Sequence, residues 1–287
     1  MKRTDFRCLD RLRVRWAEVD LQKIVFNSHY LMYFDTAVAT YWRLMAMPYN
    51  ETLEQLGGDL YVRKATVEYE GSARYDDLID VGIRCARIGT SSLVFGAAVF
   101  RGDERLVSGE LVYVFADPAT QTSRPVPQPL RDAMQAFEAG EPMVEMRVGA
   151  WRELEGDARR VRTEVFIDEQ KIPLAMEWDD ADASAVHAVA VNRFGRPVAT
   201  GRLLTDAPGI ARIGRLAVLR PMRGTRIGRA VLDSLLRAAR ERGDCEAVLN
   251  AQVSAEPFYD RAGFARRGAE FDEAGIAHVE MIRSLGD

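Results

Sequence analysis

The sequence has few of the residues that build disulfide frameworks and metal sites. Its 287 residues include three cysteines and three histidines, and the cysteines, at positions 8, 85 and 245, form no C-x-x-C pair. Scattered thiols argue against a disulfide framework or a zinc site and fit a reducing compartment. We therefore expect a protein without a metal.

Long apolar runs and an excess of charge of one sign are also missing. No uncharged run approaches the ~18 residues that a membrane span needs, and the start, MKRTDFRCLD, lacks the apolar region of a signal peptide. The formal net charge is −4, which is not the basic excess of a general nucleic-acid binder. These absences predict a cytoplasmic protein that binds neither membrane nor nucleic acid.

The sequence does have the composition of an ordinary globular protein, with 47% apolar and 29% charged residues. Its length predicts two domains of about 140 residues each. Residues 117–130, DPATQTSRPVPQPL, contain four prolines and interrupt every periodicity. A short helix is expected next, ending at Gly140, and a new strand follows. We predict two domains, 1–140 and 141–287.

The two halves have different patterns. The first half opens with an alternating strand at 11–16 and a long apolar helix at 29–46. Four strand-like runs follow, at 60–71, 78–89, 91–102 and 104–117. This order predicts an α+β domain in which an antiparallel sheet wraps around a helix. The second half alternates strands and helices, including an amphipathic helix at 228–242, and predicts an α/β domain.

An arginine-glycine loop at residues 216–228, LAVLRPMRGTRIG, has the most specific chemistry of the second half. Pro221 breaks a strand, and the loop opens directly into the amphipathic helix. The amides at a helix N-terminus, with the helix dipole behind them, form an anion site, and Gly224 and Gly228 let the backbone approach a phosphate. Several arginines surround this site: Arg220, Arg223, Arg226 and Arg229. The loop therefore predicts a pyrophosphate ligand.

This loop resembles the acetyl-CoA-binding motif of the GNAT N-acetyltransferase superfamily, R/Q-x-x-G-x-G/A. Arg223 fills its first position and Gly228 its last, while Arg226 replaces the middle glycine. The stretches EVFIDEQKIPLAMEWDDADASAVHAVAV, AQVSAEPFYDRAGF and DEAGIAHVEM look like a bacterial branch of that superfamily. The resemblance covers residues 144–283 and implies a GNAT α/β domain.

The resemblance also implies acyl transfer from CoA, expected to be acetyl transfer, to an amine acceptor. Tyr259 matches the tyrosine that protonates the leaving thiolate, and Gln252 stands where many relatives have an asparagine that contacts the cofactor. The amides that would pair with the pantetheine arm and the acyl carbonyl belong to Leu216, Ala217 and Val218. The residues that would hold the pyrophosphate are Arg223, Gly224, Thr225, Arg226, Ile227, Gly228 and Arg229.

Structural roles for these residues stay open. The arginines could form a solvated face, Tyr259 could be a core residue, and His187 and His278 could be structural histidines. The strand before the loop has no obvious general base, since Arg212 and Arg215 occupy it. The remaining candidates for that base are Glu169, Glu177 and His187.

In the first half, an acidic loop precedes the aromatic helix. In AEVDLQKIVFNSHYLMYFDTA, Asp20 comes about nine residues before the helix begins. Thioester hydrolysis needs amides that polarise the carbonyl and a carboxylate that attacks the thioester or activates water. No G-x-S-x-G motif is present, so a hydrolase here would depend on carboxylate chemistry.

The stretch resembles the 4-hydroxybenzoyl-CoA thioesterase family of hotdog proteins, with the pattern D-x-x-G-x-V-x-x-x-x-Y. Asp20, Val25 and Tyr30 fit this pattern, and Lys23 stands at the glycine. The match extends over about residues 12–117, including ATVEYEGSARYDDLIDV. It implies a hotdog fold, metal-free hydrolysis of acyl-CoA by Asp20, and a homo-oligomer, since hotdog domains build their site across a dimer interface. The implied substrate-contacting residues are Asn27, Tyr30 and Asp35.

Structural roles stay open in this half too. Asp20 could be a turn or capping aspartate, Asn27 or Ser28 could cap the helix, and Asp35 could be a structural acid. Together, the two halves predict a bifunctional enzyme that uses acyl-CoA. The alternatives are an acyl-CoA sensor or scaffold without turnover, and nucleic-acid binding through the arginine cluster.

Overall fold

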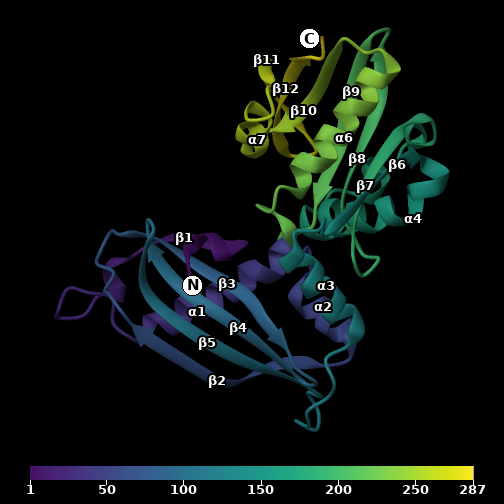
Figure 1. Cartoon of the computed structure of the whole chain (residues 1–287). Helices are drawn as coiled ribbons and strands as arrows, with labels where there is room; N and C mark the ends of the chain where they lie inside the picture. Colours follow the sequence, from purple (N-terminus) through teal and green to yellow (C-terminus); the bar gives the residue numbers. More distant parts are fainter. Residues whose placement is uncertain (287) are drawn as a thin grey trace. The chain divides into compact units, whose positions relative to one another are not determined.

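The chain divides into two compact units, Met1–Met143 and Val144–Asp287, and the computed structural model describes residues 1–286. Each unit has its own sheet (Figure 1). The first unit is an antiparallel sheet with a central helix, and the second is a mixed sheet with helices packed on it. The predicted fold class is confirmed for both halves.

The first unit is built from an antiparallel sheet and three helices. Within the described residues, its strands are β1 (Cys8–Arg13), β2 (Asp59–Tyr69), β3 (Leu78–Ile88), β4 (Ser92–Arg101) and β5 (Glu104–Ala116), and its helices are α1 (His29–Leu44), α2 (Tyr49–Leu56) and α3 (Gln128–Ala139). The strand order is β1-β3-β4-β5-β2, and every neighbouring pair is antiparallel.

Helix α1 forms the centre of this unit because one of its faces is apolar and largely aromatic. The buried residues recur three or four positions apart: Tyr30, Tyr33, Phe34, Ala37, Val38, Tyr41 and Trp42. Gly109 on β5 permits close approach of the helix, since a Cβ there would lie 2.6 Å from Cε2 of Phe34. The helix lies along one face of the sheet, as the sequence predicts (Figure 1).

Two elements of the first unit differ from the sequence prediction. The first strand ends at Arg13, earlier than the alternation suggested, because the Glu18 carboxylate accepts the Arg15 backbone N–H (2.7 Å) and closes a 3-10 turn at Trp16–Glu18. Helix α2 was not predicted. Its eight residues are too few for a clear helical period, and it is bounded by Pro48 before it and a left-handed Gly57 after it.

The second unit is a seven-stranded sheet with helices packed on it. Within the described residues, its strands are β6 (Val144–Ala150), β7 (Val186–Asn192), β8 (Pro197–Ala207), β9 (Ile210–Val218), β10 (Glu246–Gln252), β11 (Ala265–Glu273) and β12 (Ile276–Ser284). Its helices are α4 (Trp151–Arg162), α5 (Leu174–Glu177), α6 (Ile227–Arg242) and α7 (Glu256–Asp260). The order is β11-β12-β10-β9-β8-β7-β6, and the β9–β10 pair is parallel.

The sequence missed two features of this unit. Strand β11 is exposed at every position, so it has no alternation to detect and exists through its pairing with β12. The helical pattern that begins near Glu155 and runs through RRVRTEVFIDEQ to residue 170 is not one regular α-helix, because α4 ends at Arg162 and continues as a π-helix at Thr163–Glu169. Such π segments are rare in proteins, and those that occur often lie at functional sites. This one carries Phe166 and precedes Gln170, and both residues line the pocket described below.

Candidate active sites

The arginine-glycine loop leads from β9 into helix α6 through two left-handed residues. Gly224 has φ +83° and Arg226, the N-cap residue of α6, has φ +68°. Arg226 therefore adopts the backbone conformation that a glycine would supply at this position. The Thr225 hydroxyl donates a hydrogen bond to the Met222 carbonyl (2.6 Å) and closes the loop. The first N–H groups of α6 have no carbonyl partner within the helix and point out of its N-terminus, as an anion site requires.

Close packing holds the start of α6 against β9. A Cβ on Gly228 would lie 3.0 Å from Cγ2 of Val218, tighter than ordinary contact. The helix face below it is apolar, with Ile227 and Val231 buried. The loop therefore has little room to move away from the strand end.

Two arginines of this loop, Arg223 and Arg229, are bound to groups of the same unit. Arg223 forms a bidentate ion pair with Glu169, in which Nη1 donates to Oε1 (2.7 Å) and Nη2 donates to Oε2 (2.6 Å). The hydrogen bonds from Arg223 lower the pKa of Glu169. Arg229 pairs with Asp233 (2.8 Å) and donates to the Arg261 carbonyl (3.0 Å). A pyrophosphate on Arg223 would have to compete with Glu169.

Strand β9 has a bulge and loses its parallel neighbour before it reaches the loop. Opposite β8, the register shifts between the Arg202–Gly214 and Thr200–Ala217 pairs, and Arg215 in the bulge has φ +49°. Pairing with β10 ends at Arg212–Val248. The segment containing Leu216, Ala217 and Val218 thus presents one backbone edge outside the β9–β10 ladder, as pairing with a pantetheine arm would require.

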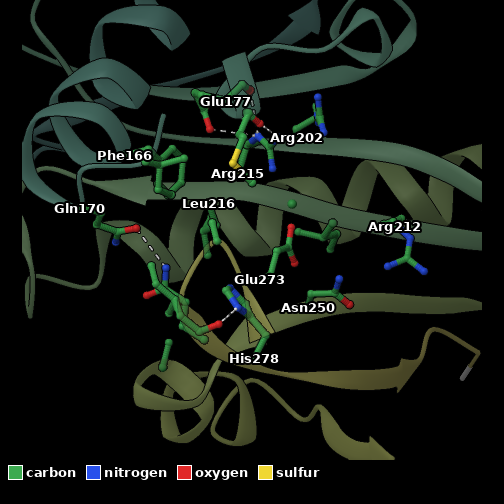
Figure 2. A pocket seen from close by; sticks show the side chains of 18 of the residues that line it. Phe166, Gln170, Glu177, Arg202, Arg212, Arg215, Leu216, Asn250, Glu273 and His278 are labelled. Carbon is green, nitrogen blue, oxygen red and sulfur yellow. Dashed lines mark hydrogen bonds and ion pairs between the residues drawn. The ribbon is translucent and has the colours of Figure 1, made fainter. Parts of the chain in front are cut away.

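A pocket of about 430 Å³ lies beside this strand edge. It brings together three of the residues predicted to bind the cofactor or act in catalysis, namely Leu216 from β9, Gln252 from the end of β10 and Tyr259 from α7. Gln252 donates a hydrogen bond from Nε2 to Oε1 of Gln170 (3.1 Å), which joins β10 to the segment after the π-helix (Figure 2). The phosphate-loop residues from Arg223 to Arg229 do not line this pocket.

Tyr259 is held by an aromatic cluster. Its side chain packs edge-on against Phe258 (4.9 Å between ring centroids) and Phe264 (5.9 Å), and 9% of the residue remains exposed. Burial raises the pKa of Tyr259, so its hydroxyl keeps its proton at neutral pH. A buried, protonated phenol is equipped to donate a proton to a departing thiolate.

One wall of the pocket is a buried network of ion pairs that the sequence did not reveal. Arg162 is 1% exposed, and it contacts Glu177 Oε1 (2.5 Å) and Asp182 Oδ1 (2.8 Å). Arg202 binds Asp179 and Asp182, and Arg215 extends the network to Glu177 (3.3 Å). Three acids and three arginines balance their charges here, so this wall is rigid and close to neutral.

The proposed general bases are engaged elsewhere. Burial raises the pKa of Glu177 although Arg162 and Arg215 oppose it, but its carboxylate is held in the ion-pair network. Glu169 is paired with Arg223. His187 is 1% exposed, and its Nε2 bonds the Asp182 carbonyl (3.0 Å) beneath the Trp151 ring. Burial lowers the pKa of His187, as expected for a structural histidine.

In the first unit, Asp20 lies in a tight turn. Its Oδ1 accepts the Gln22 backbone N–H (2.7 Å), and its own N–H donates to the Ile24 carbonyl (2.9 Å). Lys23, which stands at the glycine of the family pattern, has φ +62° and donates its N–H to the Asp20 carbonyl (2.9 Å). The carboxylate is partly exposed and retains an oxygen for other contacts.

The other predicted residues of this site have separate surroundings. Tyr30 is buried, and its hydroxyl accepts the Ala73 N–H (3.0 Å). Asn27 is exposed, and its carbonyl accepts the Tyr69 hydroxyl (3.2 Å). Asp35 lies on the exposed side of α1 and accepts the Tyr113 hydroxyl (3.0 Å). Ser28 is the N-cap residue of α1 without a side-chain cap bond.

A buried acid beside the Asp20 turn was missed in the sequence. Glu18 is 3% exposed, and its Oε2 accepts the Tyr33 hydroxyl and the Arg15 N–H, both at 2.7 Å. Burial would raise the pKa of Glu18, but these bonds and the Arg15 guanidinium outweigh burial and lower it. Glu18 therefore stays ionised and anchors the turn two residues before Asp20. Tyr33 was the only sequence signal, as a buried phenol that needs a partner.

Several large apolar side chains near this turn are exposed. They are Trp16, Leu21, Phe26, Leu31, Met32, Tyr69 and Tyr75. Leu21 is fully exposed, and Trp16 packs edge-on against Tyr75 (5.6 Å). Grouped exposed apolar residues mark interaction or ligand surfaces.

Residues 1–286 contain neither a metal-binding cluster nor a membrane-spanning helix. No three His, Cys, Asp or Glu side chains among them are arranged to hold a metal ion. No helix in that range is long and apolar enough to cross a membrane.

Comparisons with known proteins identify the domain family of each unit. The model of the acetyltransferase (GNAT) domain matches residues 155–285, and that of the thioesterase superfamily matches residues 22–108. The "Uncharacterized N-acetyltransferase YjcF" of Bacillus subtilis is 34% identical over 128 residues, which are 44% of this chain and 90% of that protein. The chain belongs to the GNAT acetyltransferases, and it joins a thioesterase (hotdog) domain to its GNAT domain in tandem.

Two solved structures are similar to parts of this chain. An acyl-CoA N-acyltransferase from Pseudomonas aeruginosa is 29% identical, with 49% of this chain and 99% of that chain covered and a TM-score of 0.45. A thioesterase from Thermus thermophilus, complexed with coenzyme A and Zn, is 26% identical, with 48% and 98% covered and a TM-score of 0.42. Both domain families use CoA-type substrates.

Proposed function

We propose that the second unit transfers an acyl group, acetyl foremost, from CoA to an amine. The observation that carries this proposal is the pocket of about 430 Å³ that unites Tyr259, Gln252 and Leu216 beside the end of the β9–β10 ladder. The start of α6 and the 223–229 loop would hold the pyrophosphate. The free edge of β9 would pair with the pantetheine arm and place the thioester in the pocket.

The chemistry then follows from the surroundings of the pocket. Amides at residues 216–218 would polarise the thioester carbonyl. The amine would attack the carbonyl carbon, and the C–S bond would break as the new C–N bond is completed. Tyr259, whose hydroxyl is protonated and buried, would give its proton to the leaving thiolate.

For the first unit, we propose hydrolysis of acyl-CoA thioesters with Asp20 as the catalytic carboxylate. The support is a partly exposed carboxylate in a turn held by Lys23 and Glu18, ahead of the N-terminus of α1. Asn27, Tyr30 and Asp35 would contact the substrate or shape its site. The exposed apolar residues near the turn favour a second copy of this chain as their cover, giving a homo-oligomer through the hotdog unit.

The chain organisation and setting complete the proposal. We propose that residues 1–140 and 141–287 are separate folding units, that neither needs a metal, and that the protein acts in the cytoplasm without nucleic-acid or membrane partners. The compact units Met1–Met143 and Val144–Asp287 support the first of these points.

A panel of acyl-CoAs tests both activities on the whole chain. Free thiol is measured with and without an amine, and the acylated amine is measured separately by mass spectrometry. Thiol release without amine reports hydrolysis, and acylated amine reports transfer. A panel in which neither product forms above the uncatalysed rate contradicts the proposal.

A second candidate is an acyl-CoA sensor without turnover. The Arg223–Glu169 pair favours it, because the free protein keeps its phosphate-loop arginine occupied. Calorimetry with CoA beside the same panel separates the two functions, since a sensor binds CoA and releases no product.

A further inference from the structure

His278 enters the acyl-transfer pocket from strand β12. The residue is half-buried and lines the same pocket as Tyr259 and Leu216. Figure 2 shows it across the pocket from Arg215 and Glu177. It therefore lies on the wall opposite the balanced ion-pair network.

The tautomer of the neutral His278 ring follows from one hydrogen bond. Its Nδ1 lies 2.8 Å from the carbonyl oxygen of Ile276. A carbonyl can only accept, so Nδ1 carries the hydrogen, and in the neutral ring the lone pair is on Nε2. Nε2 has no hydrogen-bond partner among residues 1–286. The ring thus presents an unoccupied proton acceptor.

Sheet structure holds this ring in place. Phe271 of β11 stacks on it, with centroids 6.0 Å apart and planes inclined by 26°. On the other side, His278 is the register partner of Gln252 on β10. A group oriented by two neighbouring strands can be positioned more accurately than one on a loop.

The other ionisable groups of the pocket are less suited to accept a proton. Glu177 and Asp179 are bound to arginines of the ion-pair network, and Arg212 is paired with Asp206 (2.5 Å). Glu273 lines the pocket from the exposed end of β11, and its charge would attract a cationic amine rather than direct it. His278 alone combines a fixed orientation with a free lone pair.

We propose that His278 is the general base of the transfer reaction and that the acceptor is a primary ammonium group. This proposal rests on the acyl transfer proposed above. Nε2 takes one proton from the ammonium, and the resulting amine attacks the thioester carbonyl carbon. The C–N bond forms and the C–S bond breaks. The thiolate receives the Tyr259 proton, and a second amine proton leaves to solvent. His278 then gives up its proton and Tyr259 regains one, so the products are the amide, the CoA thiol and one net proton.

The test uses the full chain with acetyl-CoA and three probe amines, namely spermidine, tyramine and a peptide with a free α-amino group. His278→Asn keeps an N–H that can bond the Ile276 carbonyl but has no basic nitrogen. We expect acetylation of the best probe to fall about 10²-fold at unchanged CoA affinity. The fall of kcat/KM toward low pH in the wild type should disappear. In His278→Ala, added imidazole should restore part of the rate.

Several outcomes would overturn the proposal. They are an unchanged rate in His278→Asn, a loss of CoA affinity that accounts for the whole effect, and a lack of rescue by imidazole. His29→Asn, the same change in the other unit, should leave acetylation unchanged. If the wild type acetylates none of the three probes, the proposed transfer and this inference both fail. If it does acetylate one, only the role of His278 is at stake.

Discussion

The two loops at which this chain would handle CoA thioesters depart from their families in the same way. Each has a long basic residue where the family pattern has glycine, and each of these residues is left-handed, Lys23 with φ +62° and Arg226 with φ +68°. The backbone path is therefore kept although the glycine is gone. A motif of this kind specifies a conformation first and a residue type second.

The loops differ in what surrounds them. Beside the arginine-glycine loop, one unit alone supplies a pocket with Tyr259, Gln252 and His278 on its walls. Around the Asp20 turn, large apolar side chains such as Leu21 and Trp16 remain exposed. The transferase half resembles a complete site, and the thioesterase half resembles one side of a site. The following experiments test that comparison.

The largest effect should come from Asp20→Asn, which should lower thioester hydrolysis at least ~10²-fold. The amide oxygen can still accept the Gln22 N–H, so the turn should persist without the charge that attacks or activates water. Hydrolysis is measured as thiol release without an amine. The same change at Asp103, in the exposed β4–β5 turn, should have no effect. Near wild-type hydrolysis in the Asp20→Asn variant would show that Asp20 is not the catalytic carboxylate.

Tyr259→Phe should lower acyl transfer about 10²-fold while hydrolysis and CoA affinity are unchanged. The ring keeps its contacts with Phe258 and Phe264, and only the proton for the thiolate is removed. Transfer is followed as acetylated amine by mass spectrometry, and affinity by calorimetry. If hydrolysis falls with transfer, the two halves do not have separate sites.

Arg223→Glu should weaken CoA binding at least tenfold, because a charge-assisted bond is worth about 1.5–3 kcal/mol and the new charge repels phosphate. Glu169→Gln should act in the opposite direction, since it frees Arg223 from its ion pair. Calorimetry with CoA measures both variants. Arg237→Glu, an equal charge change on an exposed turn of α6, is the matched control. Equal affinity in the Arg223 and Arg237 variants would exclude this loop as the phosphate site.

The smallest effects should come from Lys23→Gly and Arg226→Gly. A left-handed non-glycine residue costs about 1–2 kcal/mol, while glycine costs about 0.5–1 kcal/mol of chain entropy. Each variant should therefore keep its unfolding free energy or gain up to about 1.5 kcal/mol. Arg237→Gly, in regular helix, should lose about 1 kcal/mol. Chemical denaturation measures all three, and a loss at Arg226 equal to that at Arg237 would remove the backbone argument.

The sequence predicts those elements that neighbouring residues determine, and it misses those that depend on pairing with distant parts of the chain. Helices α1 and α6 have apolar faces at helical spacing, and the Arg226 loop lies beside its own helix, so these were predictable. Strand β11 was not, because pairing with β12 creates it and its own residues show no alternation. The π-helix is a local departure from a pattern that only predicts helix.

The same distinction between local motifs and long-range pairing applies to the candidate sites. Asp20 and Tyr259 were found within short motifs, and their roles stay predictions. The ion-pair network of Arg162, Glu177 and Asp182 behind the pocket wall required long-range pairing that no spacing in the sequence encodes. His278 was recognised only as a possible structural histidine, because its free nitrogen depends on a bond to Ile276 and a pocket formed by other strands.

The early end of the β9–β10 ladder has a consequence for motion on the timescale of amide hydrogen exchange. On either side of the bulge at Arg215, alternate amides of β9 face β8, whereas those on the other edge lose a strand partner beyond Arg212. In the free protein, a single strand should therefore show fast and slow amides in alternation. A ligand that pairs with the open edge would act as an extra strand. It would slow hydrogen exchange at the amides on the open edge and leave exchange at the amides that face β8 unchanged.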